Sequence, residues 1–192
     1  MSSNSWALFT VTCLVVGLQP HVAAAAEPNP VIAIRIENPN VLDGVNLRRA
    51  QELVSEIYEQ AGVTLDWSEG TAPERRRLTI VMTTIATAPR GLAPESMGVA
   101  PSPGDGTRGT TAYVFMDRVT QFVTKQRVSV EYVLACALAH EIGHLLLPPN
   151  SHDSEGVMRG NWHAKLFPPH APGVPGFLPK QAQLLRLRAG SR

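Results

Sequence analysis

The sequence has little charge and few aromatic residues. Charged residues make up 17% of the 192 residues and aromatic residues 6%, while hydrophobic residues make up 44%. Disordered chains carry more charge and fewer apolar residues, so we do not expect a wholly disordered protein. The net charge of +1 lacks the basic surplus of proteins that bind nucleic acid or coat an anionic membrane. We expect no nucleic-acid partner.

The chain also lacks the cysteines for a disulfide framework, having only two. Cys13 lies in an apolar run, residues 6–18, which small residues follow up to Ala26. That run has the length of a signal peptide and is short for a membrane span. We expect residues 1–26 to be cleaved, so that the mature protein is secreted or periplasmic, with no stable membrane insertion. Because the first residues contain no Lys or Arg, an uncleaved anchor is the alternative.

Glycine and proline, by contrast, are plentiful, and they predict long irregular connections within a single α+β domain, residues 27–192. Apolar patterning predicts strands and helices on either side of a loop at residues 86–110. We expect strands at residues 31–36, 63–67, 78–85 and 111–116, an edge strand near 97–100, and helices at 45–61, 130–147 and 180–189.

The helix predicted at residues 130–147 is apolar nearly all round, so it should be buried at the centre of the domain. Ser129 is suited to cap its start, as Asp43 is for the helix at 45–61. Pro148 and Pro149 should end it, because the residue before a proline is disfavoured in the α region.

Residues 140–144 of this helix read H-E-I-G-H, an H-E-x-x-H motif. Residues four apart lie on the same helix face, so His140 and His144 can bind one metal ion. Zinc suits two histidines, a third protein ligand and a water. Glu141 is placed to act as general base and acid on that water. Without a metal, three buried polar groups would be costly.

The stretch from His140 to Met158 resembles the active-site segment of metzincin-type zinc metalloproteases, H-E-x-x-H-x-x-G-x-x-H followed by a turn bearing a methionine. More specifically, it resembles small exported bacterial proteins of matrixin-like type. The resemblance implies a zincin-like fold: a mixed twisted sheet, a long helix, a buried active-site helix and a short C-terminal helix. It also implies a peptide substrate extended along the edge strand.

The family pattern is broken at two positions, where Leu147 replaces the bend glycine and Asn150 replaces the third histidine. We expect the double proline to form the bend and His152 to supply the third ligand. Asp153 and His163 are the alternatives.

Other residues near the motif have less definite roles. Met158 resembles the methionine of the family turn, while Gly160 stands where some members have a tyrosine. Arg159 and His163 are candidate donors to the oxyanion. Cys136, one turn before His140, is best explained as a small core residue, and Trp162 as a core aromatic.

Two functions from different classes remain open. The first is a zinc-dependent metalloendopeptidase, a hydrolase with His140, His144 and His152 as ligands and Glu141 as catalytic residue. The alternative is an exported zinc-binding structural or binding module without catalysis. A domain without any metal is a third and weaker hypothesis.

Overall fold

The computed structural model describes residues 28–38, 42–69, 79–102, 109–162 and 173–191. The predicted signal peptide and His163 lie outside these ranges. Within them, no helix combines the length and the apolar character that crossing a membrane requires.

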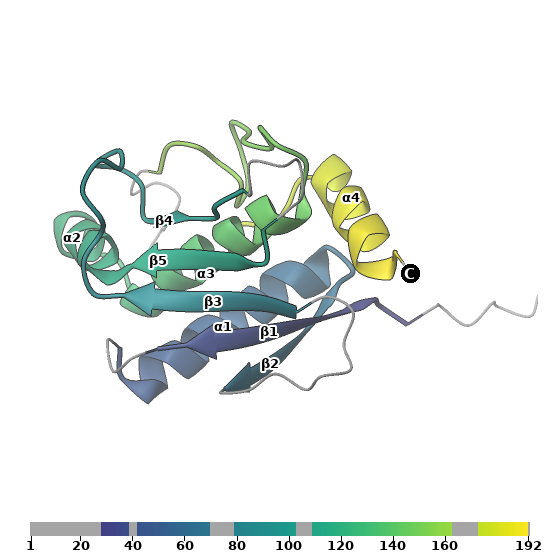
Figure 1. The fold of residues 1–192 in the computed structure, drawn as a ribbon, viewed down its shortest axis with the longest axis horizontal. Coiled ribbons are helices and arrows are strands. Elements are labelled where there is room, and N and C mark those ends of the chain that lie inside the picture. Colours follow the sequence, from purple (N-terminus) through teal and green to yellow (C-terminus); the bar gives the residue numbers. More distant parts are fainter. Residues whose placement is uncertain (1–27, 39–41, 70–78, 103–108, 163–172, 192) are drawn as a thin grey trace, which may run out of the picture.

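The described residues form a mixed α+β fold with a five-stranded sheet and four helices, which confirms the α+β part of the predicted fold class (Figure 1). The spatial order is β2-β1-β3-β5-β4, in which only β4 runs antiparallel to its neighbour. The strands are β1 (Val31–Glu37), β2 (Thr64–Glu69), β3 (Thr79–Ile85), β4 (Gly98–Val99) and β5 (Thr111–Phe115). The predicted edge strand near residues 97–100 is therefore present, although only two residues long.

Helices α1 (Gly44–Gln60) and α3 (Val130–Leu146) pack side by side on one face of the sheet (Figure 1). Asp43 caps α1 by accepting hydrogen bonds from two backbone amides, and Ser129 accepts one from the amide of Tyr132 at the start of α3. Both caps were predicted, since short polar side chains satisfy the free N–H groups of a first turn. The C-terminal helix α4 (Pro179–Gly190) packs against the end of α3.

One helix was not predicted: α2 (Met116–Gln126), which follows β5 without a loop. Its apolar side chains Val119, Phe122 and Val123 recur at helical spacing, and the first is fully buried. The strand pattern of the preceding residues extends to its first turn, which obscured the boundary. Helix α2 lies at the end of the sheet toward which β5 runs, near β4 (Figure 1).

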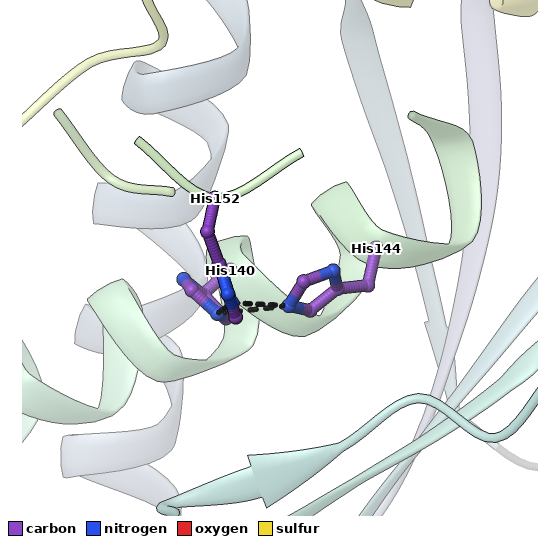
Figure 2. Close-up of side chains that lie close together, drawn as sticks. All are labelled: His140, His144 and His152. Atoms are coloured by element: carbon purple, nitrogen blue, oxygen red, sulfur yellow. Dashed lines mark hydrogen bonds between the residues drawn. The ribbon is translucent and has the colours of Figure 1, made fainter. Parts of the chain in front are cut away.

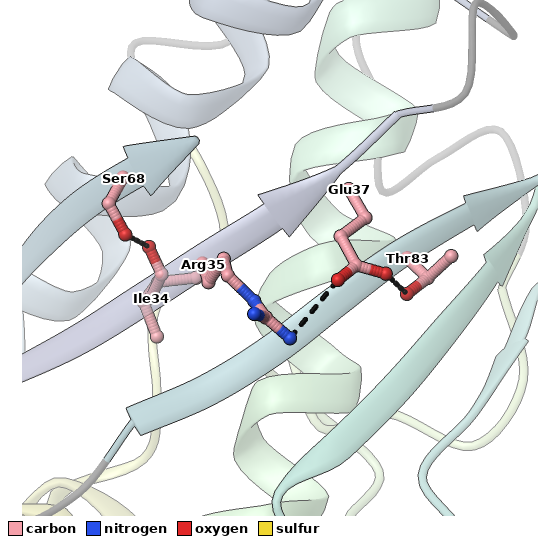
Figure 3. Close-up of polar contacts among 5 residues, drawn as sticks. All are labelled: Ile34, Arg35, Glu37, Ser68 and Thr83. Atoms are coloured by element: carbon pink, nitrogen blue, oxygen red, sulfur yellow. Dashed lines mark hydrogen bonds and ion pairs between the residues drawn. The ribbon is translucent and has the colours of Figure 1, made fainter. Parts of the chain in front are cut away.

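The opposite face of the sheet is more polar. Arg35 and Glu37, two residues apart on β1, form an ion pair of 3.1 Å, and Thr83 of β3 donates a hydrogen bond to Glu37 (Figure 3). Side chains alternate between the two faces of a strand. The buried isoleucines of β1 accordingly face the helices, and the core lies between α1, α3 and the sheet.

Candidate metal centre

Helix α3 places the H-E-x-x-H motif at the centre of the molecule. Thirteen of its 17 residues are buried, because it is covered by the sheet on one side and by α1 and α4 on others. His140 and Glu141 are 9% and 6% exposed, while His144, one turn later, is half-buried. A buried helix holds these side chains on a rigid backbone, which favours a fixed site geometry.

The chain leaves α3 without the family's bend glycine. Leu147 ends the helix with a negative φ of −86°, its amide bonds to the carbonyl of Gly143, and its side chain is 1% exposed. The left-handed residue comes three positions later, at Asn150, whose φ is 60°. Asparagine tolerates this region better than most residues. The bend thus combines Pro148 and Pro149 with Asn150.

This bend directs His152 back over the helix. Ser151, just before it, offers its carbonyl to the side-chain amide of Gln181 on α4, at 3.1 Å. A tight turn follows, in which the amide of Asp153 bonds to the carbonyl of Met158 and Gly156 has a φ of 70°. The segment carrying His152 is therefore held at both ends by hydrogen bonds.

The three histidines His140, His144 and His152 meet at one point (Figure 2). The Nε2 atom of His144 lies 3.0 Å from that of His140 and 3.0 Å from that of His152, and the remaining Nε2–Nε2 distance is 3.2 Å. They are the one group of three or more His, Cys, Asp or Glu side chains in the described part of the chain that could hold a metal ion. The other candidate, Asp153, instead accepts a hydrogen bond from the amide of Ser154.

The protonation of the cluster favours a cation at its centre. The Nδ1 atom of His140 lies 2.9 Å from the carbonyl of Val157, which can only accept, so this nitrogen carries the proton and Nε2 offers a lone pair. Burial lowers the pKa of His140 and of His144 to about 4, so both are neutral at pH 7. A neutral imidazole can offer a lone pair to a cation, which a protonated imidazole cannot.

The donor set fits zinc. Imidazole nitrogens about 2.0–2.1 Å from a tetrahedral ion lie about 3.3 Å from one another, close to the separations of the three Nε2 atoms. The contact from His140 to a backbone carbonyl is the kind of second interaction that orients a metal-binding histidine. We therefore consider the cluster suited to a metal ion bound by three imidazoles.

Glu141 lies beside the cluster and is not part of it. Burial raises the pKa of its carboxyl group to about 8, and a nearby cation would favour the charged form. Its side chain packs against Gly98 of β4: a Cβ atom on that glycine would lie 2.7 Å from Cγ of Glu141 and 2.5 Å from the carbonyl oxygen of Tyr113. Only glycine permits this approach of strand to carboxylate.

The histidines and Glu141 line a cleft of about 490 Å³ between α3 and the edge strand. Its floor and rim include Arg159, Gly160 and Trp162. Trp162, which we expected in the core, is half-buried and packs against the core from the cleft. Its ring stands edge-on to His140 at 5.8 Å, and its Nε1 donates to the carbonyl of Arg159. A tryptophan in an irregular segment gives no periodic signal, so sequence reasoning could not assign it to the cleft.

The methionine that resembles that of the family turn packs against α3 at Gly143. Met158 is fully buried, and its sulfur would lie only 2.5 Å from a Cβ atom added to Gly143. Cys136 is also buried, which raises the pKa of its thiol and agrees with a core role. Met158 and Cys136 are thus both part of the packed interior of the domain.

Comparisons with known proteins find similarity in solved structures. No family model matches the chain, and a search of curated proteins finds no similar sequence. Among solved structures, the chain is similar to archaemetzincin (amzA) from Methanopyrus kandleri, with 16% sequence identity and a TM-score of 0.47. The alignment covers 88% of this chain and 100% of that chain.

Proposed function

We propose that this protein is a zinc-dependent peptide-bond hydrolase whose metal is held by His140, His144 and His152. The observation that carries the proposal is the convergence of three Nε2 atoms in a cleft that also contains a buried carboxyl group. Imidazole ligands suit zinc among the common metals. The zincin-like, metzincin-type assignment of residues 27–192 belongs to the same proposal, supported by the H-E-x-x-H segment.

Zinc, when bound, supplies a Lewis acid that polarises a carbonyl group and makes a water more acidic. Glu141 accepts a proton from the attacking water and returns it to the leaving amine. Its burial beside Gly98 keeps the carboxyl group in one position. The contact between His140 and Val157 keeps Nε2 of His140 available as a ligand.

Strand β4 provides a place for the substrate. It is the last strand of the sheet, so its outer edge can pair with an extended peptide. Residues 97–101 of this edge line the same cleft as the histidines. A peptide paired there would place its backbone carbonyl groups near Glu141.

The test is a matched pair of variants. Glu141→Gln keeps the shape of the side chain and removes its base, so turnover of a peptide library should fall by about 10² to 10⁴ while one bound zinc per chain remains. His152→Ala should lose both zinc and activity while keeping its circular dichroism spectrum. Elemental analysis and mass spectrometry of the cleaved peptides measure the two effects.

Full zinc occupancy without hydrolysis by the parent protein would instead indicate the zinc-binding module without catalysis. That alternative is supported by the small residue at Gly160, where some metzincins have a tyrosine that contacts the transition state. No zinc in the parent protein, even after reconstitution, would remove both functions.

We also propose that the protein is exported, to the periplasm or the outside of the cell. The support is the apolar run and the small residues of positions 6–26. Intact-mass measurement of the exported protein should give a chain beginning at Glu27. A species that retains Trp6 would overturn the cleavage prediction.

A further inference from the structure

The metal-binding cleft continues into a second hollow. This hollow, of about 280 Å³, lies between α2 and the segment before β4. Gly160 and Trp162 line both spaces, as do Glu95 and Met97. A ligand in the cleft can therefore extend past the tryptophan toward α2.

The second hollow is richer in cations than the cleft. Arg118 and Lys125 of α2 line it, opposed by the single carboxylate of Glu95. The guanidinium of Arg118 donates to the backbone carbonyl of Pro94, which fixes its position and leaves four of its five donors for other groups. Within the described residues, no acidic side chain lies within ion-pair distance of either cation.

The sheet topology fixes which end of a peptide would reach this hollow. Antiparallel pairing is the more stable arrangement for an added strand. Because β4 is antiparallel to β5, a peptide antiparallel to β4 runs in the direction of β5, toward α2. Its C-terminal part then lies at the Glu95 end of the edge.

The position of Glu141 along β4 indicates how far the second hollow lies from the scissile bond. Its side chain faces Gly98, whereas the residues of the edge that line the second hollow are Met97 and Glu95. One to three residues of strand span roughly 3 to 10 Å. The hollow therefore corresponds to the first three residues after the bond that is cleaved.

We propose that the hollow formed by Arg118 and Lys125 selects peptides with a carboxylate within three residues on the C-terminal side of the scissile bond. This inference rests on the proposed peptidase function. The carboxylate belongs to an Asp or Glu side chain or to the free C-terminus of a short peptide. Both chemistries present the same anion to the same pair of cations.

The experiment uses the zinc-loaded mature protein and a peptide library with both ends blocked, with cleavage sites read by mass spectrometry. We expect Asp and Glu to be enriched about two- to fivefold in the first three positions after the cleaved bond, the range for partly exposed charge pairs. A second library with free C-terminal carboxylates distinguishes the two sources: faster cleavage within three residues of the end indicates the terminus.

Two variants should change this preference in opposite directions. Lys125→Glu should abolish it, and Glu95→Gln should strengthen it. The matched control, Arg48→Glu, makes the same change of charge on the exposed surface of α1 and should leave the preference unchanged. Arg118 is not varied, because it also holds the backbone at Pro94.

The outcomes separate the two proposals. Cleavage without acidic enrichment, or enrichment that Lys125→Glu leaves intact, would overturn the carboxylate preference and leave the peptidase standing. A fully metallated protein that cleaves neither library would overturn the peptidase function and the preference with it.

Discussion

The histidine cluster is built by two regions of opposite character. Helix α3 contributes His140 and His144, and carries the neighbouring Glu141, on a rigid and buried backbone. Residues 147–162 contribute His152 from irregular chain, held by single hydrogen bonds and two residues of positive φ, Asn150 and Gly156. The comparison indicates that the positions of His140 and His144 depend on packing, whereas the position of His152 depends on a few local contacts.

The largest loss of stability is expected at Leu147, where α3 ends and the irregular region begins. Leu147→Gly introduces the glycine that metzincins have at the bend but removes a side chain that is 1% exposed. We expect the free energy of unfolding to fall by about 3 to 5 kcal/mol, as for other buried leucines. Asn150→Gly, which places glycine at the residue with a φ of 60°, should change it by only a few tenths. Denaturant unfolding of the metal-free proteins measures both.

The reverse result, with Leu147→Gly tolerated and Asn150→Gly harmful, would mean that the bend follows the family pattern after all. It would also make the two regions less distinct than the structure shows.

An intermediate loss of stability is expected where α3 packs against the irregular region, at Gly143 and Met158. Alanine normally stabilises the interior of a helix relative to glycine. At Gly143, however, the new methyl group would overlap the sulfur of Met158, so Gly143→Ala should cost about 1 to 3 kcal/mol. Thermal or denaturant unfolding measures the loss.

The rescue variant sharpens this test. In Met158→Ala the overlap is absent, so adding Gly143→Ala to it should cost much less than in the parent protein. Equal costs in both backgrounds would show that the helix and the turn are not in contact.

The smallest effects, on stability and on zinc affinity, are expected at Gln181 of α4, which bonds to the segment that carries His152. Gln181→Ala removes the hydrogen bond to the carbonyl of Ser151 beside His152 and the bond that the side chain accepts from the amide of Leu178. Loss of such a supporting contact lowers metal affinity by about tenfold, and loss of the two bonds should cost about 1 to 2 kcal/mol of stability. Competition with a zinc chelator measures the affinity.

The control is Gln183→Ala, the same substitution on the exposed side of α4. It should leave zinc affinity unchanged. If both variants bind zinc as the parent does, then α4 does not position His152.

The sequence was sufficient to predict the regular elements of the fold other than α2. Apolar periodicity predicted α1 and α3, and the caps Asp43 and Ser129 were found because capping is a local interaction. The short edge strand was also predicted near the correct residues. Helix α2 was missed, because its start overlaps the pattern of β5.

The site was predictable only where it lies on a helix. The spacing of His140 and His144 sufficed to bring them together, whereas the place of His152 was an interpretation among three candidates. The contributions of Gly98 and Trp162 depend on contacts between segments far apart in the chain. Local sequence patterns do not indicate contacts between such distant segments.

The approach of β4 to Glu141 also has a consequence for how this cleft could be inactivated. At Gly98 there is no space for a side-chain carbon between β4 and the carboxyl group of Glu141. A methyl group there would separate the edge of β4 from the carboxyl group of Glu141 without touching His140, His144 or His152. In the proposed peptidase, metal binding and catalysis would therefore be separable by one methyl group at position 98.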